Sequence, residues 1–417
     1  MKTPGTAWLD TEEATALLGV SRATLYAYVS RGRVRSEPVP GSTRRRRYAR
    51  DDIERLRART AERRNPEKAA EQALHWGLPI LQSAITLIAE GRIYYRGRDA
   101  AALAREASLA DVAALLWTGR ADGTQCEPTT GGTRTVCAPA TAAKRTVPQP
   151  SRGGRGTARP GSSLPFVARA QAALARASAE DPAAYDLRPQ ATARTGWRIV
   201  ELLATVAAPA RGGDRTIDEA LAHGWDVPDA AALLRAAMIL CADHELNVSA
   251  FTARCVASAG TSPYGVVIAG LAALEGTKHG GTTARVEALW ESLRGSADLP
   301  KALTRRLRRG EPIDGFGHPL YAAGDPRAAV LLEMLPSSQN AAFARDIAGA
   351  AEAVLGEAPT VDFALVALTR SLGLPDGAAL TLFALGRTIG WIAHAIEQYA
   401  QDAIIRPRAR YVGENPA

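Results

Sequence analysis

Three of the six histidines lie in segments rich in glycine or acidic residues rather than on apolar helical stripes. They are His244 in ADHELNVSAF, His279 in LEGTKHGG and His318 in IDGFGHPLYAAGDPRA. Burial and neighbouring charges tune the pKa of an imidazole around neutrality, so it can hydrogen-bond a carbonyl oxygen or transfer a proton. The glycines that follow His279 and surround His318 let a ligand approach the backbone closely. Each histidine taken alone is better explained by a structural role.

The same residues do not predict a metal site. The chain has no HxxxH pair, and its one HxxE pair, His394 with Glu397, has no nearby third ligand. The four cysteines contain no CxxC pair, which argues against a zinc site or a disulfide framework and leaves reduced thiols as the expectation. We expect no metal and no cofactor.

The elements that must position these histidines are mostly helices. From Leu164 to Arg408, segments of helical length rich in alanine and leucine follow one another, separated by glycine and proline. Upstream, apolar residues on either side of Glu90-Gly91 predict one short hairpin: Ile85, Leu87, Ile93 and Tyr95. Residues 121–163 are rich in Gly, Thr, Pro, Ala and Arg without a helical period, so they predict a disordered insertion or an exposed loop. The expected fold class is all-α.

The N-terminal segment has a pattern of its own. TEEATALLGVSRATLYAYVSRG predicts two helices joined at Gly19, the first capped by Thr11 and the second by Ser21. On the second helix we expect three residues to face inward: Leu25, Tyr28 and Val29. An extended stretch ending in RRRRY (Arg44 to Tyr48) follows, and then a third helix from about Asp51 through Leu56.

This pattern resembles the small winged helix-turn-helix domains of MerR regulators and phage excisionases, with RRRRY as the wing. Residues 1–68 carry 16 Lys and Arg against 9 Asp and Glu, so nearly all of the net charge of +8 lies there. Such a local excess suits phosphate contacts beside a helix in the major groove of DNA. We expect DNA contacts from Arg22, Thr24, Arg44, Arg45, Arg46 and Arg47. The alternative is a protein-interaction or folding appendage that does not touch DNA.

Length and composition are those of an ordinary globular protein. The 417 residues fit two or three domains, and 46% hydrophobic with 23% charged residues excludes a disordered or fibrous chain. We find no apolar run of membrane-spanning length and no signal peptide, so we expect a cytoplasmic protein without a membrane partner. The expected domains are residues 1–68 and a second body formed by 69–120 and 164–417, interrupted by the insertion 121–163.

Seven short segments resemble the citrate synthase family in order and in spacing, from about Ser83 to Gly413: YRGRD, ADHELNVSAF, LEGTKHGG, GFGHPLYAAGDPRA, PTVDFA, GRTIGWIAHAIEQ and IIRPRARYVG. The resemblance implies a large and a small helical domain with the active site in the cleft between them. It also implies a homodimer whose substrates are an acyl-CoA and oxaloacetate, condensed to citrate and free CoA.

That condensation needs a base for the carbon beside the thioester and donors for the enol oxygen and the acceptor carbonyl. By resemblance Asp362 is the base, and His279 donates to the thioester and enol oxygen. His318 hydrogen-bonds the oxaloacetate carbonyl and gives it a proton. Considered alone, Asp362 is also a candidate N-cap for a helix beginning at Phe363.

The two carboxylates of oxaloacetate call for arginines, because a guanidinium group matches a carboxylate with two parallel hydrogen bonds. By resemblance Arg327 and Arg387 take these roles, Arg406 reaches in from the partner subunit, and His244 also contacts the acid. The other histidines are expected to be structural: His75, His223 and His394.

The chain departs from the family at two places. Family members often carry basic residues after the GFGH histidine that help hold the CoA phosphates, whereas Pro319 to Ala323 carries no charge. Either the preceding arginines compensate, or they form a solvated helix face: Arg305, Arg306, Arg308 and Arg309. Cys241 and Leu246 also differ from common family residues, which could alter the preferred acid or acyl group.

The complete set of predicted site residues favours a synthase. Acetyl-CoA would give citrate, and propionyl-CoA would give 2-methylcitrate, a difference of one methyl group that the sequence does not resolve. The alternative from another class is a DNA-binding regulator that uses a synthase-like body as a metabolite sensor and dimerisation platform. A lost catalytic residue would favour that alternative.

Overall fold

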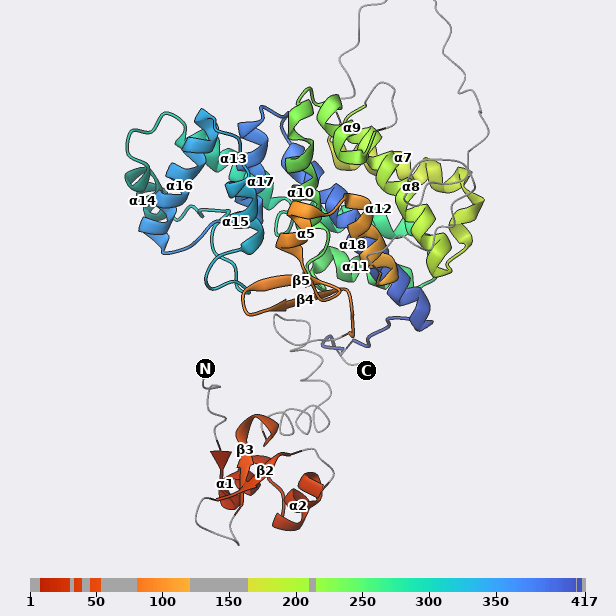
Figure 1. Cartoon of the computed structure of the whole chain (residues 1–417), viewed down its shortest axis with the longest axis vertical. Helices are drawn as coiled ribbons and strands as arrows, with labels where there is room; N and C mark the ends of the chain where they lie inside the picture. The colour runs from red at the N-terminus through yellow and green to blue at the C-terminus, as the bar shows by residue number, and fades with distance from the viewer. Residues whose placement is uncertain are drawn as a thin grey trace, which may run out of the picture. The chain divides into compact units, whose positions relative to one another are not determined.

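The computed structural model describes residues 8–30, 34–39, 46–53, 81–120, 164–209, 215–409 and 411–414. Its contacts divide the chain into two units, residues 1–82 and 83–417 (Figure 1). Each unit has a hydrophobic core of its own. The expected boundary at residue 68 and the expected insertion 121–163 lie outside the described residues.

The first unit combines two helices with a small sheet: β1 (Trp8–Leu9), α1 (Thr11–Leu18), α2 (Arg22–Ser30), β2 (Ser36–Pro38) and β3 (Arg46–Ala49). β3 pairs antiparallel with both other strands, in the order β1-β3-β2. Gly19 ends α1 in the left-handed conformation, as the predicted turn requires. The inward face of α2 is confirmed, because Leu25 is fully buried and Tyr28 and Val29 pack against the same core. Residues 50–53 are helical, and the rest of the predicted third helix lies outside the described residues.

The predicted N-cap of α1 is wrong by one residue. Asp10 caps the helix, since its carboxylate accepts from the Glu13 amide at 2.8 Å while Glu13 Oε2 accepts from the Asp10 amide at 2.9 Å. A reciprocal pair of this kind satisfies two free amides, which Thr11 alone would not do. Ser21 caps α2 as predicted, with its Oγ accepting from the Thr24 amide at 3.2 Å.

The second unit begins with the predicted hairpin. β4 (Thr86–Ala89) and β5 (Arg92–Tyr95) pair antiparallel and turn at Glu90 and Gly91, both with positive φ. A third strand, β6 (Arg98–Asp99), pairs with β5, and the sequence pattern did not predict it. The inner face of the hairpin is buried at Ile85, Ile93 and Tyr95, whereas Leu87 is exposed.

The rest of this unit is helical, which confirms the all-α class. Its α-helices are α5 (Ala100–Glu106), α6 (Leu109–Thr118), α7 (Phe166–Glu180), α8 (Pro189–Ala207), α9 (Ile217–Gly224), α10 (Ala231–Cys241), α11 (Val248–Ser258), α12 (Pro263–Leu274), α13 (Thr282–Leu293), α14 (Leu299–Arg308), α15 (Pro326–Glu333), α16 (Gln339–Leu355), α17 (Val361–Ser371) and α18 (Ala378–Gln401). Figure 1 shows α13 to α17 gathered in one lobe and the earlier helices in another.

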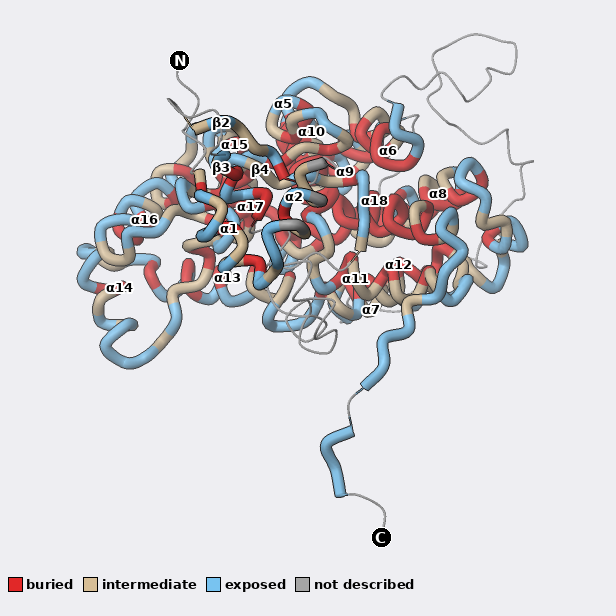
Figure 2. Tube along the Cα trace, turned by 90° about the horizontal axis from the view of Figure 1, so that it is seen from below, coloured by how far each residue is buried: buried red, intermediate tan, exposed pale blue. Residues whose placement is uncertain are grey.

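α18 is the central helix of this unit. It packs against α8, α10, α11, α12 and α17, and Figure 2 shows it buried along its length. It is also long and apolar enough to cross a membrane, so the prediction that no such run exists is wrong. Its most apolar window is 94% buried inside the unit, which explains the apolar composition by a place in the core.

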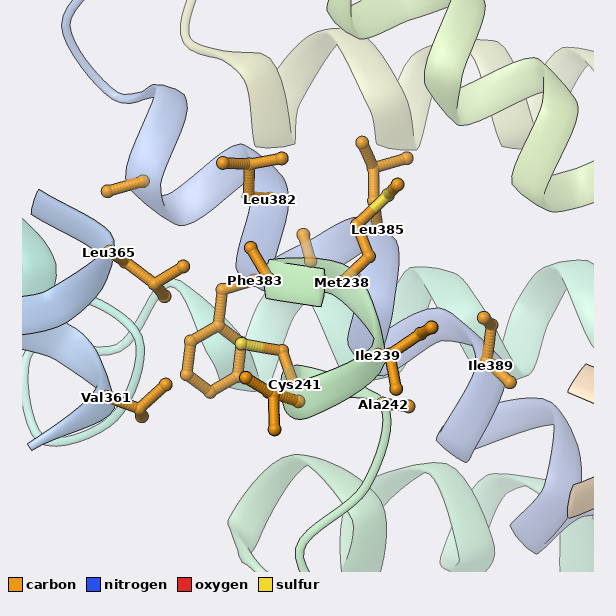
Figure 3. Close-up of a cluster of buried hydrophobic side chains, with 14 of the residues drawn as sticks. Met238, Ile239, Cys241, Ala242, Val361, Leu365, Leu382, Phe383, Leu385 and Ile389 are labelled. Carbon is orange, nitrogen blue, oxygen red and sulfur yellow. The ribbon is translucent and has the colours of Figure 1, made fainter. Parts of the chain in front are cut away.

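Two glycines let α18 lie directly against the end of α10. A Cβ on Gly386 would lie 2.2 Å from the Met238 carbonyl oxygen, and one on Gly390 would lie 2.2 Å from that of Ala242. Either would overlap the neighbouring backbone, so no larger residue fits. Figure 3 shows the resulting core, in which apolar side chains of α10, α17 and α18 meet around Cys241 and Phe383.

Candidate active site

A short backbone pairing places His318 beside the start of α17. The Gly317 amide donates to the Ala358 carbonyl at 2.9 Å, and the Thr360 amide donates to the Gly315 carbonyl at 2.8 Å. Gly315 and Gly317 both have positive φ. A Cβ on Gly315 would also lie 2.9 Å from a methyl group of Val286, so these glycines serve the pairing itself.

Asp325 connects the loop after His318 to both α15 and α17. Its carboxylate accepts from Arg327 Nε at 2.9 Å and Nη2 at 2.8 Å, and also from the Val361 amide at 3.0 Å. Both side chains of this ion pair are buried. Burial alone would raise the pKa of Asp325, but Arg327 outweighs that effect and the pKa is lowered. Arg327 is therefore held rigidly by a partner that the sequence prediction did not name.

Asp362 lies in the first turn of α17. The helix begins at Val361 after Thr360 as N-cap, so the alternative that Asp362 caps a helix beginning at Phe363 is wrong. Burial raises the pKa of Asp362 to about 6, although Arg327 acts in the opposite direction. A carboxylate with this pKa is ionised at pH 7 yet is a much stronger base than an ordinary aspartate, which suits proton abstraction from carbon.

His244, His318 and Tyr321 form a cluster of rings. His244 Nε2 lies 2.9 Å from the Tyr321 hydroxyl, and the centroids of the His244 and His318 rings are 5.3 Å apart. The guanidinium of Arg327 lies 5.6 Å from the centre of the Tyr321 ring. Burial, together with Arg327 and Arg387, holds the pKa of His244 well below its usual value, and burial lowers the pKa of His318 as well. Both imidazoles are therefore neutral at pH 7.

The hydrogen bonding of His318 fixes its tautomer. Its Nδ1 accepts from the Leu320 amide at 3.2 Å, so a neutral ring carries its hydrogen on Nε2. That nitrogen is then a hydrogen-bond donor.

His279 lies in the turn between α12 and α13. Its Nε2 is 2.8 Å from Ser249 Oγ at the start of α11, and its ring packs edge-on against Phe383, with the centroids 5.9 Å apart. Burial, assisted by Arg387, lowers the pKa of His279 to about 4. The contact with Ser249 fixes the ring and leaves Nδ1 available to a ligand.

Arg387, on α18, is the second buried arginine of the site. Its Nε donates to the Cys241 carbonyl at 2.7 Å, and its guanidinium lies 4.8 Å from the centre of the Phe383 ring. Its Nη1 is buried and has no hydrogen-bond partner among the described residues. A buried, unpaired guanidinium nitrogen is costly, so this atom marks a position that an anionic ligand would complete.

The structure thus brings six of the seven predicted site residues into one region: His244, His279, His318, Arg327, Asp362 and Arg387. Arg406 is exposed on the segment after α18, which leaves the body of the unit in Figure 2. The sequence prediction missed Tyr321, Asp325 and Phe383. Tyr321 and Asp325 belong to the same short segment as His318, GFGHPLYAAGDPRA, so their closeness in sequence to His318 could have identified them as candidates.

The other predicted residues have local partners. In the first unit, Arg22 pairs with Glu12, Arg47 with Glu37, Arg46 contacts Ser36 and Thr24 contacts Ser21, whereas Arg44 and Arg45 lie outside the described residues. Near the end of α14, Arg306 and Arg309 pair with Glu311. His223 is exposed, His394 is fully buried, and His75 lies outside the described residues.

Comparisons with known proteins find relatives for both parts of the chain. The family model for the citrate synthase C-terminal domain matches residues 73–408, and a helix-turn-helix domain model matches residues 8–61. Citrate synthase of Haloferax volcanii is 31% identical over 364 residues, covering 81% of this chain and 94% of that protein. A 2-methylcitrate synthase of Shewanella oneidensis is 35% identical over 188 residues, covering 43% of this chain and 50% of that protein.

A solved structure shows the same fold. It is a citrate synthase from Thermoplasma acidophilum in a ternary complex with carboxymethyl coenzyme A and oxaloacetate. The two structures superpose with a TM-score of 0.62 at 22% identity, covering 83% of this chain and 97% of the other. The chain is therefore an enzyme of the citrate synthase family that carries a helix-turn-helix domain at its N-terminus.

Proposed function

We propose that the second unit condenses an acyl-CoA with oxaloacetate, using Asp362, His279 and His318 as its catalytic residues. One observation carries the proposal: a carboxylate with a raised pKa, two neutral imidazoles and two buried guanidinium groups converge in one region. A solved structure supports the substrates, because the citrate synthase of Thermoplasma acidophilum forms a complex with oxaloacetate and a CoA analogue.

The first step removes a proton from the carbon beside the thioester. Asp362 takes this proton, and the negative charge moves to the thioester oxygen as the enolate forms. His279 holds that oxygen with a hydrogen bond from Nδ1, which requires Nε2 to accept from the Ser249 hydroxyl. The Ser249 hydroxyl has one hydrogen, and Asn247 Oδ1 and His279 Nε2 each lie 2.8 Å from its oxygen. The proposed role requires this hydrogen to turn to His279, while Asn247 Oδ1 keeps the hydrogen bonds from the Ser249 and Ala250 amides.

The second step forms the carbon–carbon bond. The enolate carbon attacks the ketone carbon of oxaloacetate, and the ketone oxygen receives a proton from His318 through Nε2 as the new bond forms. The proton that Asp362 gained in the first step returns through solvent to His318, which restores both groups. Arg387 Nη1 and the remaining donors of Arg327 bind the two carboxylates of oxaloacetate. Water then hydrolyses the thioester of the product and releases free CoA.

The test is thiol release from acetyl-CoA and from propionyl-CoA, with and without oxaloacetate. Asp362→Ala is compared with the wild type and with Asp346→Ala, which changes an exposed aspartate of α16. The proposal requires oxaloacetate-dependent release that Asp362→Ala abolishes and Asp346→Ala retains. The faster donor distinguishes citrate from 2-methylcitrate synthesis. Absence of turnover with both donors refutes the proposal, and the metabolite-sensor alternative then leads.

We propose further that Arg406 completes the site of a second copy of the chain. Arg406 is exposed on a segment beside exposed Ile404, Tyr411 and Val412, which suits a role outside its own subunit. Mixing Arg406→Ala with Asp362→Ala chains tests this, because a mixed dimer contains one site with both residues intact. Recovery of activity on mixing supports the proposal, and two variants that stay inactive together refute it.

A second function, DNA binding, is proposed for the first unit on the basis of its helix-turn-helix match and its antiparallel wing. Arg46 and Arg47 lie on strand β3 of that wing, and the ion pair of Arg47 with Glu37 is partly exposed. Partly exposed ion pairs of this kind contribute about 0–1 kcal/mol, so a DNA phosphate can replace the partner at small cost. Fluorescence anisotropy with random duplex DNA, comparing full-length Arg46→Ala/Arg47→Ala with wild type, tests it. Equal affinities across a salt titration refute it.

A further inference from the structure

A second pair of titratable groups lies next to the site but takes no part in the proposed chemistry. His394 Nε2 is 3.2 Å from Asp243 Oδ1, and both side chains are completely buried. His394 Nδ1 has no hydrogen-bond partner among the described residues. A buried polar pair of this kind is expensive to desolvate, so its presence calls for a reason other than general stability.

Asp243 directly precedes His244, and the small sheet holds it from the other side. Thr86 of β4 donates to Asp243 Oδ2 at 2.6 Å, and the hydroxyl of Tyr95 on β5 lies 3.3 Å from both the amide and the carbonyl of Asp243. The turn that carries His244 is therefore fixed between the hairpin and α18.

One face of α18 contacts the backbone that leads from the end of α10 to Asp243. Gly386, Gly390 and His394 follow one another at intervals of four residues, so they share a face of the helix. The two glycines lie against the backbone of Met238 and Ala242, and His394 binds Asp243. Next to them Arg387 donates to the Cys241 carbonyl. The same face thus sets the positions of both Arg387 and the turn before His244.

The charge of Asp243 also acts on Arg387. Burial lowers the pKa of Arg387, and Asp243 is the first of the groups that oppose this. The pKa of Asp243 is in turn lowered mainly by His394 and to a smaller extent by Arg387. An ionised Asp243 therefore supplies a fixed negative charge near a guanidinium that must stay charged to bind a carboxylate.

We propose that Asp243 and His394 are positioning residues, which together hold His244 and Arg387 in the geometry that binds oxaloacetate. The hydrogen bond from His394 orients the Asp243 carboxylate and with it the turn from Cys241 to His244. This inference rests on the proposed function in one respect, that His244 and Arg387 are the groups that bind the substrate.

Two substitutions separate this role from simple packing. His394→Gln keeps a donor that can reach Asp243, and His394→Leu fills a similar volume without any donor. Leu174→Ala is the control for a general loss of stability, because Leu174 is fully buried on α7, which carries none of the site residues. All variants are made in the full-length chain, and KM for oxaloacetate and kcat are measured beside the melting temperature.

In His394→Leu we expect the KM for oxaloacetate to rise about 10- to 100-fold, with kcat changed much less, because the residues that bind oxaloacetate, His244 and Arg387, are displaced. His394→Gln is expected to stay within about 3-fold of the wild type, as it restores the hydrogen bond. Leu174→Ala is expected to lower the melting temperature without changing KM. Equal KM values in His394→Leu and the wild type overturn the proposal, as do equal increases in both His394 variants.

A crystal structure of each variant gives a readout that does not depend on the reaction. Displacement of residues 241–244 and loss of the His244–Tyr321 contact in His394→Leu, but not in His394→Gln, supports the positioning role. An unmoved turn in His394→Leu overturns it. This result stands even if the wild type releases no CoA, in which case the proposed function fails separately.

Discussion

Replacing Asp362 by asparagine is expected to stabilise the folded chain at pH 8 while removing its proposed base. Burial raises the pKa of this carboxyl from 3.8 to about 6, so ionisation is disfavoured in the folded state. Residues kept for chemistry commonly carry such a cost in stability. An amide of nearly the same shape has no charge to bury, so the substitution removes the cost together with the base.

The magnitude follows from the pKa. A rise from 3.8 to about 6 corresponds to about 3 kcal/mol of cost for the ionised form at pH 8. Asparagine loses the attraction between a carboxylate and the N-terminal turn of α17, which is about 0.3–1 kcal/mol. Its amide also needs hydrogen-bond partners, and leaving one unmet costs about 1 kcal/mol. We therefore expect a net gain of about 1–2 kcal/mol in the free energy of unfolding.

The gain has a defined pH dependence. Because the folded chain binds this proton more tightly than the unfolded chain, the cost is fully present above pH 6. It disappears as the pH falls from 6 toward 3.8, where wild-type Asp362 becomes neutral in the folded state. The difference between Asp362→Asn and the wild type should therefore be large at pH 8 and small at pH 5.

Thermal unfolding of the full-length chain, followed by circular dichroism at both pH values, measures this difference. Asp346→Asn on α16 is the matched control, since Asp346 is exposed. We expect Asp362→Asn to melt a few degrees higher than the wild type at pH 8 and Asp346→Asn to melt with the wild type. A lower melting temperature for Asp362→Asn at pH 8, or an equal difference at both pH values, refutes the reasoning.

Three further predictions concern the same site. Asp325→Asn is expected to destabilise the chain by about 3–5 kcal/mol, because Arg327 would remain buried without its charged partner; urea unfolding measures this, and an unchanged midpoint contradicts it. Tyr321→Phe removes the hydroxyl 2.9 Å from His244 Nε2 and is expected to raise KM for oxaloacetate about 5-fold with an unchanged melting temperature; an unchanged KM would show that this contact is not used. The rate of CoA release at low acyl-CoA concentration should rise with pH, reach half its maximum near pH 6 and level off above about pH 7, because Asp362 must be ionised to accept a proton; a plateau already reached at pH 5 contradicts the raised pKa.

Much of the fold could be predicted from local patterns. The turn at Gly19 and the hairpin at Glu90-Gly91 each contain a glycine, Gly19 or Gly91, that accepts positive φ, so both could be predicted from the local sequence. The inward face of α2 follows from helical periodicity alone. The cap of α1 was misplaced by one residue, because several polar residues next to each other offer similar caps and the choice depends on Glu13.

The site residues were named from short segments in the right order, and the structure brings six of the seven together. The segments could not show the pKa of each group or the contacts that orient its side chain. The pKa of Asp362 depends on burial among α17, Arg327 and Asp325, which are brought together by the pairing of two loops. The contacts of Tyr321 with His244 and of Phe383 with His279 join segments that are far apart in the sequence, whereas Phe383 and Arg387 lie one turn apart on α18.

His394 is the clearest example of a contact that the tertiary structure reveals and the sequence does not. From the sequence it was expected to be a structural histidine, and only the packing of α18 against the end of α10 brings it to Asp243. The sequence by itself determined which residue types are available and which helices and turns carry them, because those depend on local periodicity and backbone freedom. The tertiary structure decided which of them are buried, paired or left with an unpaired donor, because desolvation and electrostatic interactions depend on groups that are distant along the chain.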